Sequence, residues 1–395
     1  GYGRVLTINK TVPGTGSLTL AGANTFGGSS HGYTGGLTLQ DGILIAGASS
    51  SAGGAAGPFG PDDSVLTIAG GTLAATGAAR TATNAAINMN GDFALGTAAA
   101  DQKLTLGQAA GAFNLGAATN RSLTVNNTTQ FDSAITGAGS TLTKAGEGTL
   151  IITGINTYNG LTTVNAGSLA LQGAGVLPGD VTVNGATFTN TSTAANSVAR
   201  ATAINPGGTY NLSVPAANYN GNITLAAGGI LNMNGTGRYS GILTNTGGAF
   251  KVSGTVTCTA PYTNNVGTTF GIPAGSTVTM IGGVTNNGAA NINGDLTGNL
   301  ANNTGGTVGG AGTITDALMN SGIVNPGNSP GTLTVGTYTS NPGSTQVVEI
   351  ASASNYDKIV TTAAGGATLN GGTLAPILLI GSFPAPITAF YVVQA

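Results

Sequence analysis

A three-residue unit recurs along this chain, made of an apolar residue, a threonine and a second apolar residue. Copies stand at Leu18–Leu20, Leu37–Leu39, Leu66–Ile68, Val181–Val183 and Leu333–Val335. Alternation of apolar and polar residues over a few positions is typical of a strand with one buried face, and β-branched threonine suits the outer face of such a strand. Helical periodicity is absent from the sequence, so the pattern predicts an all-β chain.

The spacing of these units predicts how the strands are arranged. Apolar positions recur at a nearly constant interval in the series Leu104, Leu123, Leu142, Leu161 and Val181. Glycine clusters separate the strands, and glycine permits the positive φ angles of tight turns. A unit of this length cannot bury its own apolar face, but stacked units bury a continuous core. We therefore predict a right-handed parallel β-helix (β-solenoid) with roughly 19–20 residues per coil, in preference to a sandwich of short β-meanders.

Composition and charge limit the partners of the chain. Of the 395 residues 40% are hydrophobic and 6% charged, the mean hydropathy is +0.23 and the net charge is −2, which predicts a folded chain rather than a disordered one. The ten Lys and Arg residues are scattered from Arg4 to Lys358 without a cluster, so no nucleic acid is expected as a partner. A net charge near zero promotes association, which predicts a homo-oligomer or a filament.

The single cysteine and the chain ends give three further expectations. Cys258 has no second cysteine to pair with, and we interpret it as a small residue on a strand. The longest apolar stretch, Leu374 to Phe383, is interrupted by Pro376 and is shorter than the roughly 20 residues of a membrane helix. The start of the sequence, Gly1 to Arg4, lacks a basic segment followed by an apolar core, so we expect any secretion signal to have been removed.

One stretch matches the pattern of a hydrolase nucleophile. Gly28-Ser29-Ser30-His31-Gly32 fits G-x-S-x-G and contains the only histidine of the chain. A nucleophile elbow requires a strand, a sharp turn and a helix, with the base held elsewhere in the sequence, and a histidine beside the serine does not replace that base. We therefore interpret this stretch as an exposed polar loop.

Acidic residues are too few and too scattered to indicate a catalytic site. Enzymes that act on polysaccharides require paired carboxylates, or carboxylates with calcium and a basic residue. Asp62 and Asp63 lie in a Pro- and Gly-containing segment typical of a turn. The remaining acids that we considered share no register along the chain, namely Asp41, Asp132, Glu147, Asp295, Asp316 and Glu349.

No cofactor is expected either. One histidine and one cysteine do not supply the ligands of a transition-metal site, and no glycine-rich stretch has phosphate-binding or dinucleotide spacing. We therefore predict no catalytic, cofactor-binding or metal-binding residues and no enzyme activity. Four tyrosines remain as sugar-stacking candidates, although aromatic residues of solenoids more often pack in the core: Tyr158, Tyr239, Tyr262 and Tyr338.

Residues 146–169, with the sequence GEGTLIITGINTYNGLTTVNAGSL, resemble the autotransporter-associated β-strand repeat. A second copy runs from Gly14 through Asn24-Thr25-Phe26 to Leu39, with Gly27 to Gly32 as an insertion that lengthens a turn. Residues 310–314, 324–335, 357–360 and 369–374 resemble the end of autotransporter passengers.

The resemblance implies two regions and a place of action. Residues 1–300 would be a β-helix repeat region and residues 301–395 a capping segment of autochaperone type that assists folding during export. In this family a translocator β-barrel follows the passenger, so the barrel is an expected partner during export and the polypeptide would be cut just before it. The expected location is extracellular or on the bacterial outer cell surface, after secretion through the outer membrane.

The resulting prediction is a structural or adhesive surface protein, a processed passenger that self-associates into filaments or a surface layer. Glycans or other cell surfaces are further expected partners. Two alternatives remain open at this point, a polysaccharide-degrading enzyme built on the β-helix and a carbohydrate-binding module.

Overall fold

Short parallel strands make up the described part of the chain. The computed structural model describes residues 6–8, 17–20, 36–51, 57–98, 102–216, 218–379 and 389–395, and of the first two ranges the backbone alone. All pairings between the strands of these ranges are parallel, and the same ranges contain no helix. None of the described residues therefore belongs to a helix that could cross a membrane. The predicted all-β fold, a parallel β-solenoid, is confirmed.

The chain divides into two compact units. Unit 1 contains residues 1–203 and 207–210, and unit 2 contains residues 204–206 and 211–395. The strands β21 (Thr202–Ile204) and β22 (Thr209–Val214) contain the boundary between them. The expected functional division into residues 1–300 and 301–395 stays a prediction.

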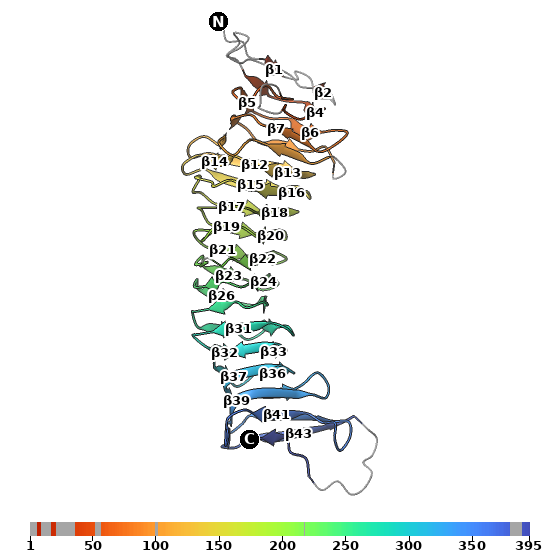
Figure 1. Cartoon of the computed structure of the whole chain (residues 1–395), viewed down its shortest axis with the longest axis vertical. Coiled ribbons are helices and arrows are strands. Elements are labelled where there is room, and N and C mark those ends of the chain that lie inside the picture. The colour runs from red at the N-terminus through yellow and green to blue at the C-terminus, as the bar shows by residue number, and fades with distance from the viewer. Residues whose placement is uncertain are drawn as a thin grey trace. The chain divides into compact units, whose positions relative to one another are not determined.

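Unit 1 contains three stacks of strands, in which each strand pairs with its neighbours in the stack (Figure 1). The first stack is β1 (Leu6–Ile8), β3 (Leu37–Leu39), β5 (Val65–Ile68), β8 (Ala86–Met89), β11 (Ala112–Asn114) and β14 (Ala134–Thr136). The second is β2 (Ser17–Leu20), β4 (Ile43–Ala46), β6 (Thr72–Ala75), β9 (Phe93–Leu95), β12 (Asn120–Val125), β15 (Thr141–Ala145), β17 (Thr162–Val164) and β19 (Val181–Val183). The third is β7 (Arg80–Ala82), β10 (Leu104–Leu106), β13 (Thr128–Phe131), β16 (Thr149–Ile152), β18 (Ser168–Leu171) and β20 (Thr187–Asn190).

Unit 2 is built in the same way. One stack is β24 (Ile230–Gly235), β27 (Ala249–Val252), β30 (Thr269–Ile272), β33 (Ala289–Ile292), β36 (Thr307–Gly310), β38 (Ile323–Pro326), β40 (Thr345–Ile350) and β43 (Thr373–Leu378). Two other stacks meet in the long strand β37 (Thr313–Asn320). The first consists of β25 (Arg238–Tyr239), β28 (Thr257–Cys258), β31 (Thr277–Met280) and β34 (Asp295–Thr297). The second consists of β29 (Tyr262–Asn264), β32 (Val284–Asn286) and β35 (Leu300–Asn302). The remaining strands are the pair β23 (Ile223–Leu225) and β26 (Leu243–Asn245), then β39 (Thr332–Ser340), which pairs with β37, β41 (Lys358–Thr361) and β42 (Ala367–Leu369), and β44 (Val393–Gln394) on β41.

The predicted coil length holds over part of the chain. Thr149 pairs with Ser168 and Ala249 pairs with Thr269, and both separations equal the predicted length of one coil. Other coils are longer or shorter, because the connecting turns differ in length. Leu37, for example, pairs with Leu66, so that coil is much longer than predicted.

Part of the regular spacing in the sequence has a different origin from the one predicted. Leu104 lies in β10 and pairs with Thr129, whereas Leu123 lies in β12 and pairs with Lys144. The two leucines therefore belong to different stacks and do not lie one above the other. Since one coil of unit 1 contains several strands with the same alternation, two apolar-threonine-apolar units can fall within one coil.

Inward-facing apolar residues stack from coil to coil and form the core of each unit. In unit 1, Leu150, Leu169 and Phe188 occupy paired positions of three successive coils, and all three are buried. Aromatic rings continue such stacks, with Phe188 and Tyr210 at 4.7 Å between ring centroids. In unit 2, the stacked rings of Phe250 and Phe270 have centroids 5.6 Å apart. Offset stacking at these distances adds to the free energy gained from apolar burial.

A buried ladder of asparagines runs through unit 2 at the ends of β29, β32, β35 and β37. The Nδ2 of Asn264 donates to Oδ1 of Asn286 at 2.7 Å, and the Nδ2 of Asn286 donates to Oδ1 of Asn302 at 2.8 Å. Asn302 donates in turn to Asn320 at 2.8 Å. An amide has both donors and an acceptor, so one residue type repeats this contact on every coil.

Candidate functional site

Of the residues considered as candidates for hydrolase chemistry, the structure describes the acidic pair but not the G-x-S-x-G stretch. The stretch Gly28 to Gly32, with His31, lies outside the described residues. Asp62 and Asp63 are the central residues of a turn in which the Ser64 N–H donates to the Pro61 carbonyl at 2.9 Å. The Thr83 hydroxyl donates to the carboxylate of Asp62, so this acid joins two coils.

Other acidic side chains also have structural partners. Asp132 accepts hydrogen bonds from Gln130 Nε2 at 2.6 Å and from Thr153 Oγ1 at 2.9 Å. Asp357 is fully buried and accepts from the backbone N–H groups of Gly331 and Glu349, at 2.7 and 2.8 Å. Within the described ranges, no group of three or more His, Cys, Asp or Glu side chains gathers as metal ligands.

The cysteine and the tyrosines lie in the core. Cys258 is buried in β28, and burial raises the pKa of its thiol to about 12, so the thiol stays protonated. Tyr158, Tyr239, Tyr262 and Tyr338 are at most 3% exposed, so they do not present their rings to a sugar. Burial raises the pKa of each of these four tyrosines.

The segment between β16 and β17 contains one side chain that connects successive coils of unit 1, Asn156, and one that is anchored within its own coil, Tyr158. Oδ1 of Asn156 accepts from the Ile135 N–H on one coil, and its Nδ2 donates to the Val176 carbonyl on another, both at 2.7 Å. The hydroxyl of fully buried Tyr158 lies 2.7 Å from Oγ1 of Thr162. The segment Asn156 to Gly160 is therefore a structural clamp.

Lys144 is an unusual member of the core column in β15. It occupies the position that Leu123 and Val164 hold on the adjacent coils, and its side chain is 0% exposed. Its ammonium donates to the carbonyls of Gly146 and, at 2.8 Å, Ala166, which lie in the turns of two coils. Burial lowers the pKa of Lys144 from its ordinary 10.5 to about 8, and the nearby Glu147 partly opposes this shift.

We expect this lysine to make stability depend on pH. Above a pH of about 8 the unfolded chain binds more protons at this position than the folded chain, so the free energy of unfolding rises with pH up to about 10.5. We compare the wild type with Lys144→Met by denaturant titration between about pH 7.5 and pH 9.5. Over this range the difference between their free energies of unfolding should move by about 2 kcal/mol in favour of the wild type. Parallel curves would show that the ammonium is not desolvated.

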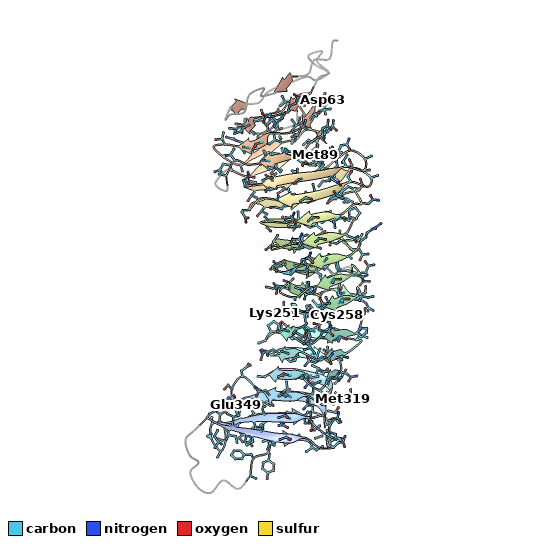
Figure 2. All side chains as sticks on the ribbon, turned by 180° about the vertical axis from the view of Figure 1, so that it is seen from behind. Asp63, Met89, Lys251, Cys258, Met319 and Glu349 are labelled. Carbon is cyan, nitrogen blue, oxygen red and sulfur yellow. The ribbon has the colours of Figure 1, made fainter. Side chains whose placement is uncertain are left out.

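An open hollow lies on the outer face of unit 2, over β24, β27, β30 and β33. Its volume is about 620 Å³, and two outward columns cross it, one of which is formed by Asn232, Lys251, Gly271 and Asn291 on successive strands. Figure 2 labels Lys251 on this stack. The other residues that line the hollow are Ile230, Ala249, Phe250, Thr269, Phe270, Ile272, Pro273, Ala289 and Asn293.

Polar groups at the hollow have hydrogen-bonding capacity left over. The side chain of Lys251 is exposed, and its ammonium has no ion-pair or hydrogen-bond partner among the residues that the structure describes. Asn232 donates to Asn211 at 2.9 Å through Nδ2, and Asn291 accepts from Asn293 at 2.9 Å through Oδ1. The Asn232 oxygen and the Asn291 nitrogen therefore remain for a ligand.

Sequence reasoning did not identify Lys251 or Gly271. The one available signal was a glycine inside the strand pattern Thr269-Phe270-Gly271-Ile272, which usually marks a bulge or a close backbone approach. The regular pairing of β30 on both sides shows no bulge. Only the register of the coils places this glycine beside Lys251.

The fold and the contacts between its coils define the class of protein to which the chain belongs. The chain is a parallel β-solenoid whose coils are joined by side-chain contacts between repeats. Residues 13–46 and 142–171 match the family model described as Passenger-associated-transport-repeat, and the second match contains Lys144, Asn156 and Tyr158. The comparison with curated proteins gives no match. The repeat matches and the β-solenoid together fit an autotransporter passenger repeat protein, and such a passenger implies secretion to the cell surface.

Proposed function

We propose that the chain is a structural or adhesive protein of the bacterial outer cell surface, a processed autotransporter-type passenger that associates with further copies of itself. A translocator β-barrel would be its partner during export through the outer membrane. The passenger repeat supports a structural rather than a catalytic domain. The observation that supports self-association is an apolar rung at the end of unit 2 that no other described strand covers.

This rung is the strand β43. Gln346, Val348 and Ile350 of β40 face the core and are buried, and they pair with Leu374, Pro376 and Leu378 of β43. Leu374 and Leu378 continue the same inward column, yet they are 50% and 54% exposed. A hollow of about 380 Å³ lies beside Leu374, with Leu369, Val392 and Val393 also in its lining. A column of core positions that is left exposed favours an apolar partner surface.

Pro376 limits how that partner can attach. The N–H groups of Thr373 and Leu379 donate to the carbonyls of Ser344 and Ile350 on the neighbouring coil. The backbone groups of the even-numbered residues between them therefore face the free edge. Pro376 is one of these residues and has no N–H, which interrupts the donors along the edge. Proline on a free edge is a common protection against strand addition. A second copy would therefore pack by side chains rather than extend the sheet.

We expect substitutions in β43 to change association in opposite directions. Leu378→Asp places a charge in the apolar patch and should lower the assembled fraction, whereas Pro376→Val restores an edge donor and should raise it. Analytical ultracentrifugation and electron microscopy of the purified chain at low and high concentration measure both effects. Val266→Asp, at an apolar turn residue that is 79% exposed, is the matched control and should leave assembly unchanged.

Single particles of the wild type at every concentration would contradict self-association. Equal assembly of the wild type and Leu378→Asp would instead show that copies associate through another surface. An assay for sugar release from a panel of polysaccharides tests the enzyme alternative, and turnover by the purified chain would overturn the structural assignment. A carbohydrate-binding role is the second candidate, and the hollow around Lys251 and Gly271 favours it.

A further inference from the structure

We propose that the hollow over Gly271 binds carboxylate-bearing sugar units of an acidic polysaccharide. This inference deepens the second candidate role and rests on the proposed surface location. It does not depend on self-association, because the hollow lies on β24 to β33 and the uncovered rung lies on β43.

Gly271 keeps the hollow open without a backbone reason to be glycine. Most of the glycines that the structure describes either have a positive φ or would bring a Cβ atom into collision with a neighbouring atom. Gly271 has no positive φ, and the nearest atom to an added Cβ would be the Asn291 carbonyl oxygen at 4.0 Å. A β-branched residue would suit this outer strand position better than glycine. Glycine at this position therefore leaves space above the strand for a ligand, and the conformation of the strand does not require it.

The charge at the hollow selects an anion. Lys251 is the only charged residue in the lining as described, and no carboxylate of the lining neutralises it. The backbone groups of Lys251 and Gly271 take part in the ladder between β27, β30 and β33, so they cannot form a cradle of N–H donors for phosphate. One ammonium beside amide groups matches one carboxylate, through a charge-assisted hydrogen bond.

The neutral groups indicate that the anion belongs to a sugar. A sugar hydroxyl both donates and accepts hydrogen bonds, so it needs acceptors and donors in the protein. The Asn232 oxygen can accept, the Asn291 nitrogen can donate, and the Thr269 hydroxyl can do both. Ile230 and Pro273 add aliphatic surface for the carbon face of a pyranose ring. The volume of about 620 Å³ lies within the range of about 300–1,000 Å³ for small-molecule sites and is open to solvent, so a longer chain can enter.

The test uses the full chain and defined probes. Oligomers of galacturonate, glucuronate and mannuronate, with neutral galactose and glucose oligomers for comparison, are titrated by isothermal calorimetry. We expect saturable binding of at least one uronate series, weakened by salt, and no comparable binding of the neutral oligomers. Gly271→Thr, which fills the hollow, and Lys251→Gln, which removes the charge, should each weaken uronate binding about tenfold or more.

Two controls separate these effects from general ones. Gly309→Thr adds the same side chain to the same outward column two strands further on, and Arg238→Gln removes a charge from an exposed position on β25. Both should bind like the wild type, and thermal unfolding should show all four variants folded. The absence of uronate binding to the wild type, equal binding of neutral oligomers, or unchanged binding by Gly271→Thr would each overturn the proposal. None of these results would alter the sedimentation test of self-association.

Discussion

Replacing Asn286 by alanine should destabilise unit 2 by about 3–5 kcal/mol, because this one buried side chain makes four hydrogen bonds, two of them fully buried. Its Nδ2 donates to Asn302 Oδ1 at 2.8 Å and to the carbonyls of Thr307 and Gly288 at 3.0 and 3.1 Å. Its Oδ1 accepts from Asn264 at 2.7 Å. Alanine removes the partners of the buried Asn264 and Asn302 amides, and a buried polar group without a partner costs about 1–3 kcal/mol. The carbonyls of Gly288 and Thr307 are half-buried, and the Gly288 carbonyl still accepts from the Thr307 N–H.

The matched control is an exposed asparagine pair on the same coils. Asn303 donates to Asn287 at 2.8 Å on the surface, where water replaces a lost partner, so Asn287→Ala should cost about 0.5 kcal/mol or less. Denaturant titration gives the free energy of unfolding, and hydrogen exchange over 284–320 shows whether the loss is local to the ladder. Similar values for the two variants would mean that the ladder does not stabilise the fold.

The strands and their stacking could be predicted from the sequence, but the register could not. Alternation of apolar residues with threonine identified the strands, because one face of each strand is buried. The coil length was correct where turns are uniform, as between Thr149 and Ser168. It did not describe the stretch with Leu104 and Leu123, because identical alternation in different stacks gives no sign of which strands are neighbours.

The same limit applies to the ladder and to the hollow. The intervals between Asn264, Asn286, Asn302 and Asn320 differ from one another, so no fixed period marks these residues in the sequence. Lys251 and Gly271 are one coil apart, in a chain that is rich in glycine, and only the pairing of β27 with β30 brings them together. The clamp residues Asn156 and Tyr158 were recognisable as part of a repeat, but their contacts with the preceding and following coils were not.

Substitution of Gly179, which stacks on Gly160 at the end of the clamp, should have the second large effect on stability, in unit 1. An added Cβ on Gly160 would lie 2.2 Å from the carbonyl oxygen of Ser140, and one on Gly179 would lie 2.0 Å from the carbonyl oxygen of Gly160. Neither glycine has a positive φ, so the requirement arises from stacking alone. Coils are held about 4.8 Å apart by the ladder, which leaves no room for either Cβ. Gly179→Ala should therefore destabilise unit 1 by about 3 kcal/mol or more.

Gly185→Ala separates crowding from backbone conformation in this experiment. Gly185 has φ +59° and no atom within 4 Å of an added Cβ, so alanine there should cost only the left-handed conformation, about 1–2 kcal/mol. Denaturant unfolding of the two variants, with hydrogen exchange over 135–180, measures the difference. If Gly179→Ala proves no more destabilising than Gly185→Ala, the coils can separate at this corner at little cost. The close approach of successive backbones would then not be what fixes the stacking of the clamp.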